Sequence, residues 1–165
     1  MKKIPVEFNY FISLIFVFIS SCSNKTVSFT PKERSLVKDS VQFMVNSITK
    51  DLSHKGPIAW LTYFENTPDF FMASNGQLEF PNIDTAKSFI TNTLVKIIPK
   101  IELRWSNIQI TALTNKFASI SAIYHEDITD STGKTTPYDG YFTAIAHQSS
   151  DGWKLHNAHW SSMTH

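Results

Sequence analysis

Two predicted strands at the end of the chain decide its fold: residues 136–148 read TPYDGYFTAIAHQ, and residues 153–163 read WKLHNAHWSSM. The region from residue 100 onward, to which both belong, is rich in isoleucine, aromatic residues and threonine, and the segment SDG at 150–152 supplies a turn between them. Two similar stretches precede them, at 117–129 and 100–113, and short polar turns separate all four. Four long strands joined by short turns predict an antiparallel meander.

A long helix is predicted near the start of the domain. Thr30 can cap this helix, Pro31 suits its first position, and Glu33 can complete a capping box. Apolar residues then recur at spacings of three and four as far as Leu52. This pattern indicates a helix with one buried face.

Two shorter helices follow the break at Gly56. The first carries Trp60 and Phe64, and the second is expected to have Asp84 as its N-cap and to stop at Pro99. A brief strand is predicted between them at 70–73, turned by the segment NG at 75–76. Three helices, one short strand and a four-strand meander predict an α+β fold of a single domain.

The last two predicted strands do not confine their apolar residues to one face. Strict alternation places Leu155, Asn157 and His159 on one face and Ala158 and Trp160 on the other. An antiparallel sheet usually exposes one polar face, so two partly apolar faces suggest a partner on each side. We expect the helices to cover one face and a second copy of the chain to cover the other, giving a homodimer through the sheet.

The segments GYFTAI (140–145), DGWKL (151–155) and HWS (159–161) resemble the SnoaL-like branch of the nuclear transport factor 2-like superfamily. The resemblance covers residues 35–163. It implies a cone-shaped, curved antiparallel sheet of four long strands and one or two short ones, enclosing three N-terminal helices and a mostly apolar pocket. It does not define an activity, because the superfamily includes isomerases, dehydratases, hydrolases, cyclases and proteins that only bind or assemble.

Two catalytic arrangements of that superfamily are not evident in this sequence. Ketosteroid isomerase-like members use an acid on the first short strand and a tyrosine on the first helix, and neither predicted element contains such a residue. Epoxide hydrolase-like members use an Asp-Arg-Asp arrangement, but no pair of carboxylates flanks Arg34 or Arg104. We therefore expect binding rather than catalysis, with enzymatic activity left open.

A set of aromatic and polar side chains without a recognised catalytic arrangement is predicted to line the pocket. Its members are Trp60, Phe64, Tyr124, Glu126, Tyr141, Asn157 and His159. His159 is the weak candidate for a general base, with Glu126 or Tyr124 setting its tautomer. The alternative is a buried, hydrogen-bonded His159 that closes the end of the cone.

No metal site and no cofactor are predicted. His156 and His159 are three residues apart, so on a regular strand they point to opposite faces and cannot share an ion. Neighbouring His125 and Glu126 diverge for the same reason, although His125 and Asp127 share a face.

The N-terminal residues have the features of a secretion signal. Lys2 and Lys3 precede an apolar run at 11–19, which is roughly half the ~20 residues needed to span a bilayer. The segment ISSC at 19–22 resembles the lipobox of bacterial lipoproteins, in which the cysteine is diacylated and the chain is cut before it. An ordinary cleaved signal and a membrane helix are the alternatives.

The lipobox divides the chain into a signal peptide at 1–21, a tether at 22–30 that starts at lipidated Cys22, and a SnoaL-like α+β domain at 31–165. Lipidation, for example with palmitate, would anchor the domain to a membrane and would consume the only thiol of the sequence. Ser23 permits export of such lipoproteins, so we expect a periplasm-facing place at the outer membrane of the cell envelope.

The charge balance of the chain after removal of the signal peptide bears on its function. Removal of Lys2, Lys3 and Glu7 leaves equal numbers of basic and acidic side chains and no basic block, which argues against nucleic-acid binding. The preferred function is a lipid-anchored module that binds a small apolar or amphipathic ligand, or that acts as a dimeric interaction module. The alternative is an envelope enzyme of the isomerase, dehydratase or hydrolase type, with His159 as general base.

Overall fold

The structure is a computed structural model that describes residues 29–163. The predicted signal peptide, the lipidation site and most of the tether therefore lie outside the described residues. None of the helices in the described part of the chain is long and apolar enough to span a membrane.

The first helix, α1 (Pro31–Lys55), begins where the sequence predicts. The side-chain oxygen of Thr30 accepts a hydrogen bond from the backbone N–H of Glu33 at 3.2 Å, and the Glu33 carboxylate accepts one from the backbone N–H of Thr30 at 2.7 Å. The predicted capping box is confirmed. The helix ends at Gly56, whose φ is +68° and whose missing Cβ would lie 2.8 Å from the carbonyl oxygen of Pro99.

The remaining helices are short: η1 (Gly56–Ala59), α2 (Trp60–Tyr63), α3 (Ile83–Phe89), the π-helical η2 (Ile90–Leu94) and α4 (Val95–Ile97). The last three run on without a break. Their N-cap is Asn82, whose side-chain oxygen accepts from the N–H of Thr85 at 2.9 Å, so the predicted cap at Asp84 is wrong. With Asn82 as the N-cap, the helix begins at Ile83, which is buried.

Within the described residues, six strands form one sheet: β1 (Phe71–Ser74), β2 (Gln77–Phe80), β3 (Lys100–Ala112), β4 (Phe117–Thr129), β5 (Thr135–Ser149) and β6 (Gly152–Ser162). Their order is β2-β1-β6-β5-β4-β3. The four long strands form the predicted meander, but the sheet is mixed because β1 pairs with β6 in parallel. The chain already runs alongside β6 at Phe64, which bridges to Leu155 in the same sense, so β1 enters the sheet in that direction.

A bulge in β6 changes which side chains share a face. Ile145 of β5 lies opposite Asn157, whereas the next residue, Ala146, lies opposite Leu155, so His156 is an extra residue in β6. Leu155 and Ala158 are consequently both buried against the helices. The predicted alternation is wrong beyond His156, because a one-residue shift transfers every later side chain to the other face.

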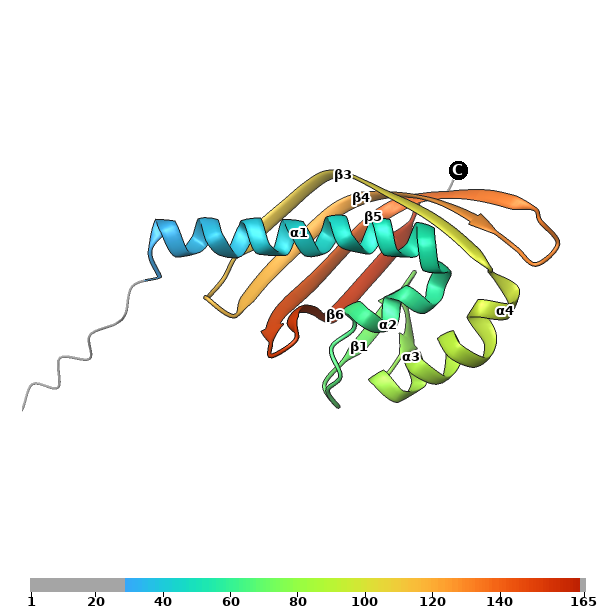
Figure 1. The fold of residues 1–165 in the computed structure, drawn as a ribbon, viewed down its shortest axis with the longest axis horizontal. Helices are drawn as coiled ribbons and strands as arrows, with labels where there is room; N and C mark the ends of the chain where they lie inside the picture. Colours follow the sequence, from blue (N-terminus) through green and yellow to red (C-terminus); the bar gives the residue numbers. More distant parts are fainter. Residues whose placement is uncertain (1–28, 164–165) are drawn as a thin grey trace, which may run out of the picture.

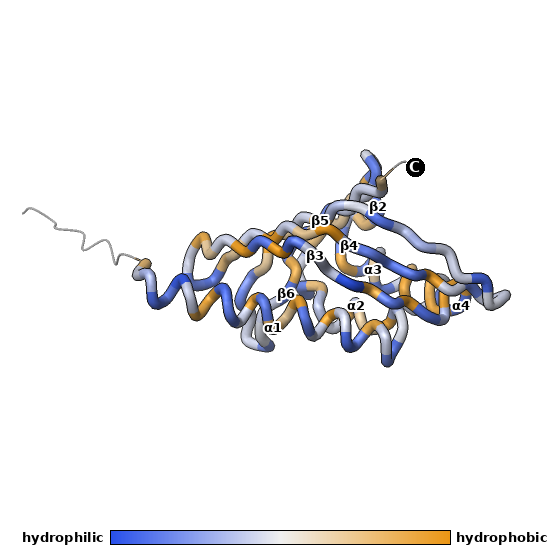
Figure 2. The backbone as a smooth tube through the Cα atoms, turned by 90° about the horizontal axis from the view of Figure 1, so that it is seen from above, coloured by the Kyte–Doolittle hydropathy of each residue, from blue (hydrophilic) through white to orange (hydrophobic). Residues whose placement is uncertain are grey.

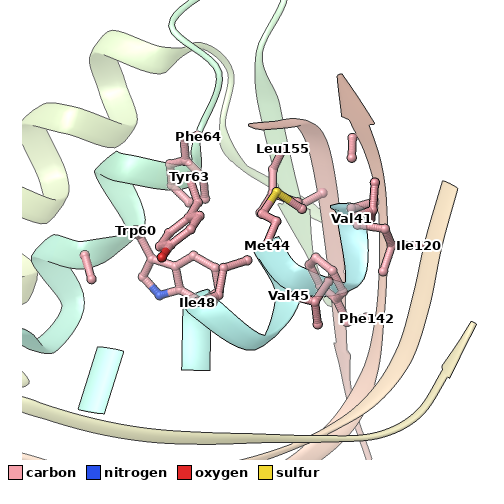
Figure 3. Close-up of a cluster of buried hydrophobic side chains, with 14 of the residues drawn as sticks. Val41, Met44, Val45, Ile48, Trp60, Tyr63, Phe64, Ile120, Phe142 and Leu155 are labelled. Atoms are coloured by element: carbon pink, nitrogen blue, oxygen red, sulfur yellow. The ribbon is translucent and has the colours of Figure 1, made fainter. Parts of the chain in front are cut away.

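The helices cover the concave face of the sheet. In Figure 1, α1 lies across the long strands, while α2, α3 and α4 lie below their curved ends. Along α1, apolar and polar positions alternate in the manner of an amphipathic helix (Figure 2). Side chains of α1, α2 and the strands converge in one buried cluster, in which Val41, Ile48, Phe142 and Leu155 are at most 2% exposed (Figure 3). Each such side chain stabilises the fold by about 1.5–3 kcal/mol.

Candidate functional site

A cavity of about 330 Å³ lies on the helical side of the sheet, beside α2. Its walls come from α2, the β1–β2 hairpin, the helical segment 83–97, the first half of β3, the end of β4, and β6. The lining residues are Trp60, Phe64, Met72, Ser74, Glu79, Phe80, Phe89, Ile90, Leu94, Ile98, Ile101, Glu126, Ile128 and Trp160. Most of these side chains are apolar, as is usual for a small-molecule site.

Aromatic rings form a large part of this lining. Trp60 stacks on Phe64 with ring centroids 5.7 Å apart and meets Trp160 edge to face at 5.6 Å. Between β2 and α3, the ring centroids of Phe80 and Phe89 lie 5.6 Å apart. These contacts give the cavity a wall of mutually packed aromatic rings.

Glu126 is the polar residue that distinguishes the cavity. It projects from β4 between Leu103 of β3 and Tyr138 of β5, and its side chain forms no hydrogen bond with any other residue of the described part of the chain. Protein surrounds most of the side chain, and the part that faces the cavity remains accessible. Burial raises the pKa of Glu126 to about 7, because the charged form loses its hydration without gaining a partner.

A second carboxylate lines the same cavity. Glu79 of β2 accepts a hydrogen bond from the hydroxyl of Ser74 at 2.7 Å, across the β1–β2 hairpin. The sequence indicates no acid on the first short strand, and this is correct for β1. The acid comes instead from the returning strand β2, which the sequence analysis missed. Lysine, arginine and histidine are absent from the cavity lining described above.

The sheet separates the residues that were predicted to share a pocket. Trp60, Phe64 and Glu126 do line the cavity. Tyr124 is buried next to it, with its ring 4.8 Å from that of Trp160 and its hydroxyl 3.2 Å from the hydroxyl of Ser162.

Tyr141, Asn157 and His159 project from the opposite, convex face. Asn157 and His159 line a separate depression there of about 300 Å³, and Tyr141 is 42% exposed. Glu126 therefore cannot orient His159, and His159 is neither the base of this cavity nor the buried histidine that closes the cone. The cause is the bulge at His156, which sequence periodicity did not reveal.

The same bulge accounts for a lining residue that the sequence analysis missed. Trp160 faces the cavity and contacts Trp60, Trp105, Tyr124 and Phe142. A signal was present, because Leu155 and Ala158 are apolar at a spacing of three rather than two. That spacing is typical of a strand that contains one extra residue.

Three side chains on the convex face form a hydrogen-bonded chain. The hydroxyl of Ser106 lies 3.0 Å from Nε2 of His125, and Nδ1 of His125 lies 2.7 Å from the carboxylate of Asp139. The order matches that of a serine hydrolase triad. However, the side chains of His125 and Asp139 are 41% and 36% exposed, and none of the three lines a cavity described above. We interpret the chain as a link between β3, β4 and β5.

Two further histidines share one carboxylate. Glu65 accepts from Nδ1 of His147 at 2.5 Å and from Nδ1 of His156 at 2.7 Å. Burial alone would raise the pKa of Glu65, but these two hydrogen bonds outweigh it and lower the pKa. Within residues 29–163, no group of three or more His, Cys, Asp or Glu residues is arranged to hold a metal ion.

A larger hollow of about 570 Å³ lies between α1 and the β5–β6 turn. Phe43 lines it and is 74% exposed, and its acidic residues Asp39 and Asp151 are also exposed. Lys154 in this hollow donates to the carbonyl of Thr62 at 2.7 Å. Solvent competes with every polar contact at such a surface, so the cavity at Glu126 is the better candidate.

No protein-family model matches the chain, and no curated protein matches it in sequence. Solved structures do match it. A nuclear transport factor 2-like superfamily protein from Salmonella enterica serovar Typhimurium superposes with a TM-score of 0.67 at 17% identity, covering 79% of this chain and 94% of the other.

Two further matches are named for enzymes. A candidate scytalone dehydratase from Novosphingobium aromaticivorans gives a TM-score of 0.70 at 11% identity, covering 82% of this chain and 89% of the other. A hexachlorocyclohexane dehydrochlorinase gives 0.65 at 8% identity, covering 82% and 90%. At these identities the similarity concerns architecture and not activity. The long first helix, the curved six-stranded sheet and these superpositions show that the chain has the nuclear transport factor 2-like fold.

Proposed function

We propose that the domain binds a small, mostly apolar ligand in the cavity between α2, the helical segment 83–97 and the sheet, and that Glu126 contacts the polar group of this ligand. The observation that carries the proposal is an enclosed carboxyl group without a protein partner, facing a cavity with aromatic walls.

The energetics of Glu126 favour a functional role. Leaving a buried polar group without a hydrogen bond costs about 1–3 kcal/mol, and an apolar residue at this position would avoid that cost. Strongly shifted carboxyl groups in cavities are typical of binding and catalytic sites. The volume of about 330 Å³ lies at the lower end of the range for small-molecule sites, which favours a compact ligand over a long-chain lipid.

Catalysis is the second candidate, and the pKa of Glu126 is the observation that favours it. A carboxyl group with a pKa of about 7 is suited to accept or donate a proton near neutral pH. Two structures with this fold are named for a dehydratase and a dehydrochlorinase, which are elimination enzymes. In this alternative Glu126, and not His159, is the base, because His159 lies on the other face of the sheet.

Ligand retention tests the binding proposal. Native mass spectrometry of the purified full chain is expected to detect a bound small molecule, or binding of members of an apolar ligand library. Leu94→Trp, which fills the cavity, is expected to abolish this binding. Phe43→Trp, which adds an indole on the exposed side of α1, is the matched control and should bind normally. Failure of the wild type to bind any library member, or equal binding by Leu94→Trp, would refute the proposal.

We also propose that the chain is a lipoprotein of the cell envelope, cut before Cys22, lipidated there and facing the periplasm at the outer membrane. The support is the lipobox-like segment at 19–22. Because α1 begins at Pro31, the tether would hold the domain within about 30 Å of the bilayer. Metabolic labelling with an alkyne-tagged palmitate tests this. Label should appear in the wild type and disappear in Cys22→Ser, and an unlabelled wild type would refute it.

A homodimer through the convex face is the remaining proposal. Phe71 and Tyr141 are more than 40% exposed on this face, and Ile123 and Ile145 lie partly exposed beside them. Apolar groups exposed in this way are typical of surfaces that associate.

A further inference from the structure

The charges around the cavity restrict the chemistry of its ligand. Glu79 and Glu126 line it, and lysine, arginine and histidine do not. Ser74 adds a hydroxyl, which already donates to Glu79. An anionic ligand such as a fatty acid would find two carboxylates and no cation to pair with, so the lining selects against it.

The aromatic walls point in the same direction. Trp60, Phe64 and Trp160 lie together on one side of the cavity, and Phe80 and Phe89 lie together on another. The face of an aromatic ring attracts a cation, and tryptophan does so most strongly. Cages of aromatic rings are a usual means of holding a quaternary ammonium group, and a carboxylate adds charge attraction.

The state of Glu126 completes the argument. This carboxyl group has lost much of its hydration and has gained no hydrogen-bond partner from the described residues. A neutral ligand could form one hydrogen bond with it but would leave the ionised form without a counterion. A cationic head beside Glu126 supplies the missing counterion inside the cavity, where the attraction is stronger than in water.

We infer that the ligand is an organic cation, with an amine or quaternary ammonium head against Glu126 and a compact apolar body among the aromatic rings. This inference rests on the proposed binding function. The ligand is then positively charged and carries an ammonium head group, and Glu126 is the residue that determines specificity.

Binding of such a cation should depend on pH. The cation requires ionised Glu126, so below pH 7 its affinity should fall about tenfold for each pH unit, and above pH 7 it should level off. The other titratable group of the lining is Glu79 on β2. The residues from α2, the helical segment, β3 and β6 are apolar or aromatic, and Tyr138 flanks Glu126 on β5.

Matched probes test the inference on the purified full chain. Benzyltrimethylammonium carries a fixed charge, 2,2-dimethylpropylbenzene is its neutral isostere, and phenylacetate is an anion. At pH 8, NMR titration is expected to show the cation binding at least tenfold more tightly than the isostere and phenylacetate not binding. Because the cation has no proton to lose, a decrease in its affinity between pH 8 and pH 5 reports on the protein.

Two variants test whether the preference for the cation arises from Glu126. Glu126→Gln should remove most of the preference for the cation and its pH dependence. Glu102→Gln, at an exposed position of β3, should preserve both. Equal or tighter binding of the neutral isostere, or an unchanged preference in Glu126→Gln, would overturn the cation inference and leave the binding function intact. If no probe and no library member binds, both proposals fail.

Discussion

Replacing Glu126 by glutamine should change how stability depends on pH. In the folded protein the pKa of this carboxyl group is about 7, against an ordinary value of 4.5. Between these values the folded state holds a proton that the unfolded state has released, so stability falls as pH rises. The shift of about 2.5 units corresponds to a penalty of roughly 3 kcal/mol, which is absent below pH 4.5 and complete above pH 7.

Glutamine has nearly the shape of the protonated acid and carries no charge at any pH. The variant should therefore match the wild type near pH 4.5 and exceed it by up to roughly 3 kcal/mol at pH 8. The assay is urea denaturation of both proteins at half-unit steps from pH 4.5 to pH 8, reading the difference in the free energy of unfolding. In thermal unfolding at pH 8 the gain corresponds to roughly 10 °C.

The difference between the two proteins isolates Glu126 from other titrating groups. Glu65, for example, has a lowered pKa, so its stabilising contribution is lost as pH falls, but it is lost equally in both proteins. Glu102→Gln is the control, because its side chain is 45% exposed and pairs with Lys100 at the surface. Parallel curves for wild type and Glu126→Gln across this range would refute the assignment of Glu126 as an enclosed, unpaired acid.

Three further outcomes follow from the packing and the surface. Gly140→Ala should destabilise the fold by more than about 2 kcal/mol in urea denaturation, because its Cβ would lie 2.1 Å from the carbonyl oxygen of Ser161; a neutral effect would contradict the close approach of β5 and β6. Glu65→Gln should cost about 1–3 kcal/mol at pH 8, since it weakens two hydrogen bonds, and an unchanged midpoint would argue against that cluster. Tyr141→Arg should convert the proposed dimer to a monomer in sedimentation velocity without unfolding the domain, and a monomeric wild type would refute the dimer.

The parts of the fold that depend on local chemistry could be predicted from the sequence. The capping box at Thr30 and the turn at Asn75 are specified by a few neighbouring residues, and the limits of β4 follow from the polar turns at 114–116 and 130–134 that flank it. The parallel pairing of β1 with β6 could not be predicted in this way, because it depends on where a distant segment enters the sheet. The cap at Asn82 was missed because Asn82 and Asp84 are both good N-caps, and only tertiary burial of Ile83 distinguishes them.

The composition of the candidate site depends on the bulge in β6, which the sequence did not predict. In β6, the extra residue His156 turns Asn157 and His159 to the convex face and brings Trp160 over the cavity. The resemblance to a known family identifies this segment as important but does not say which of two adjacent aromatic residues faces inward. Once Trp160 replaces His159 in the cavity, Glu126 loses the histidine that would have been its partner. A mostly buried carboxyl group without a partner is stabilised either by protonation, which its raised pKa reflects, or by a counterion, and the cationic ligand that we propose would supply that counterion.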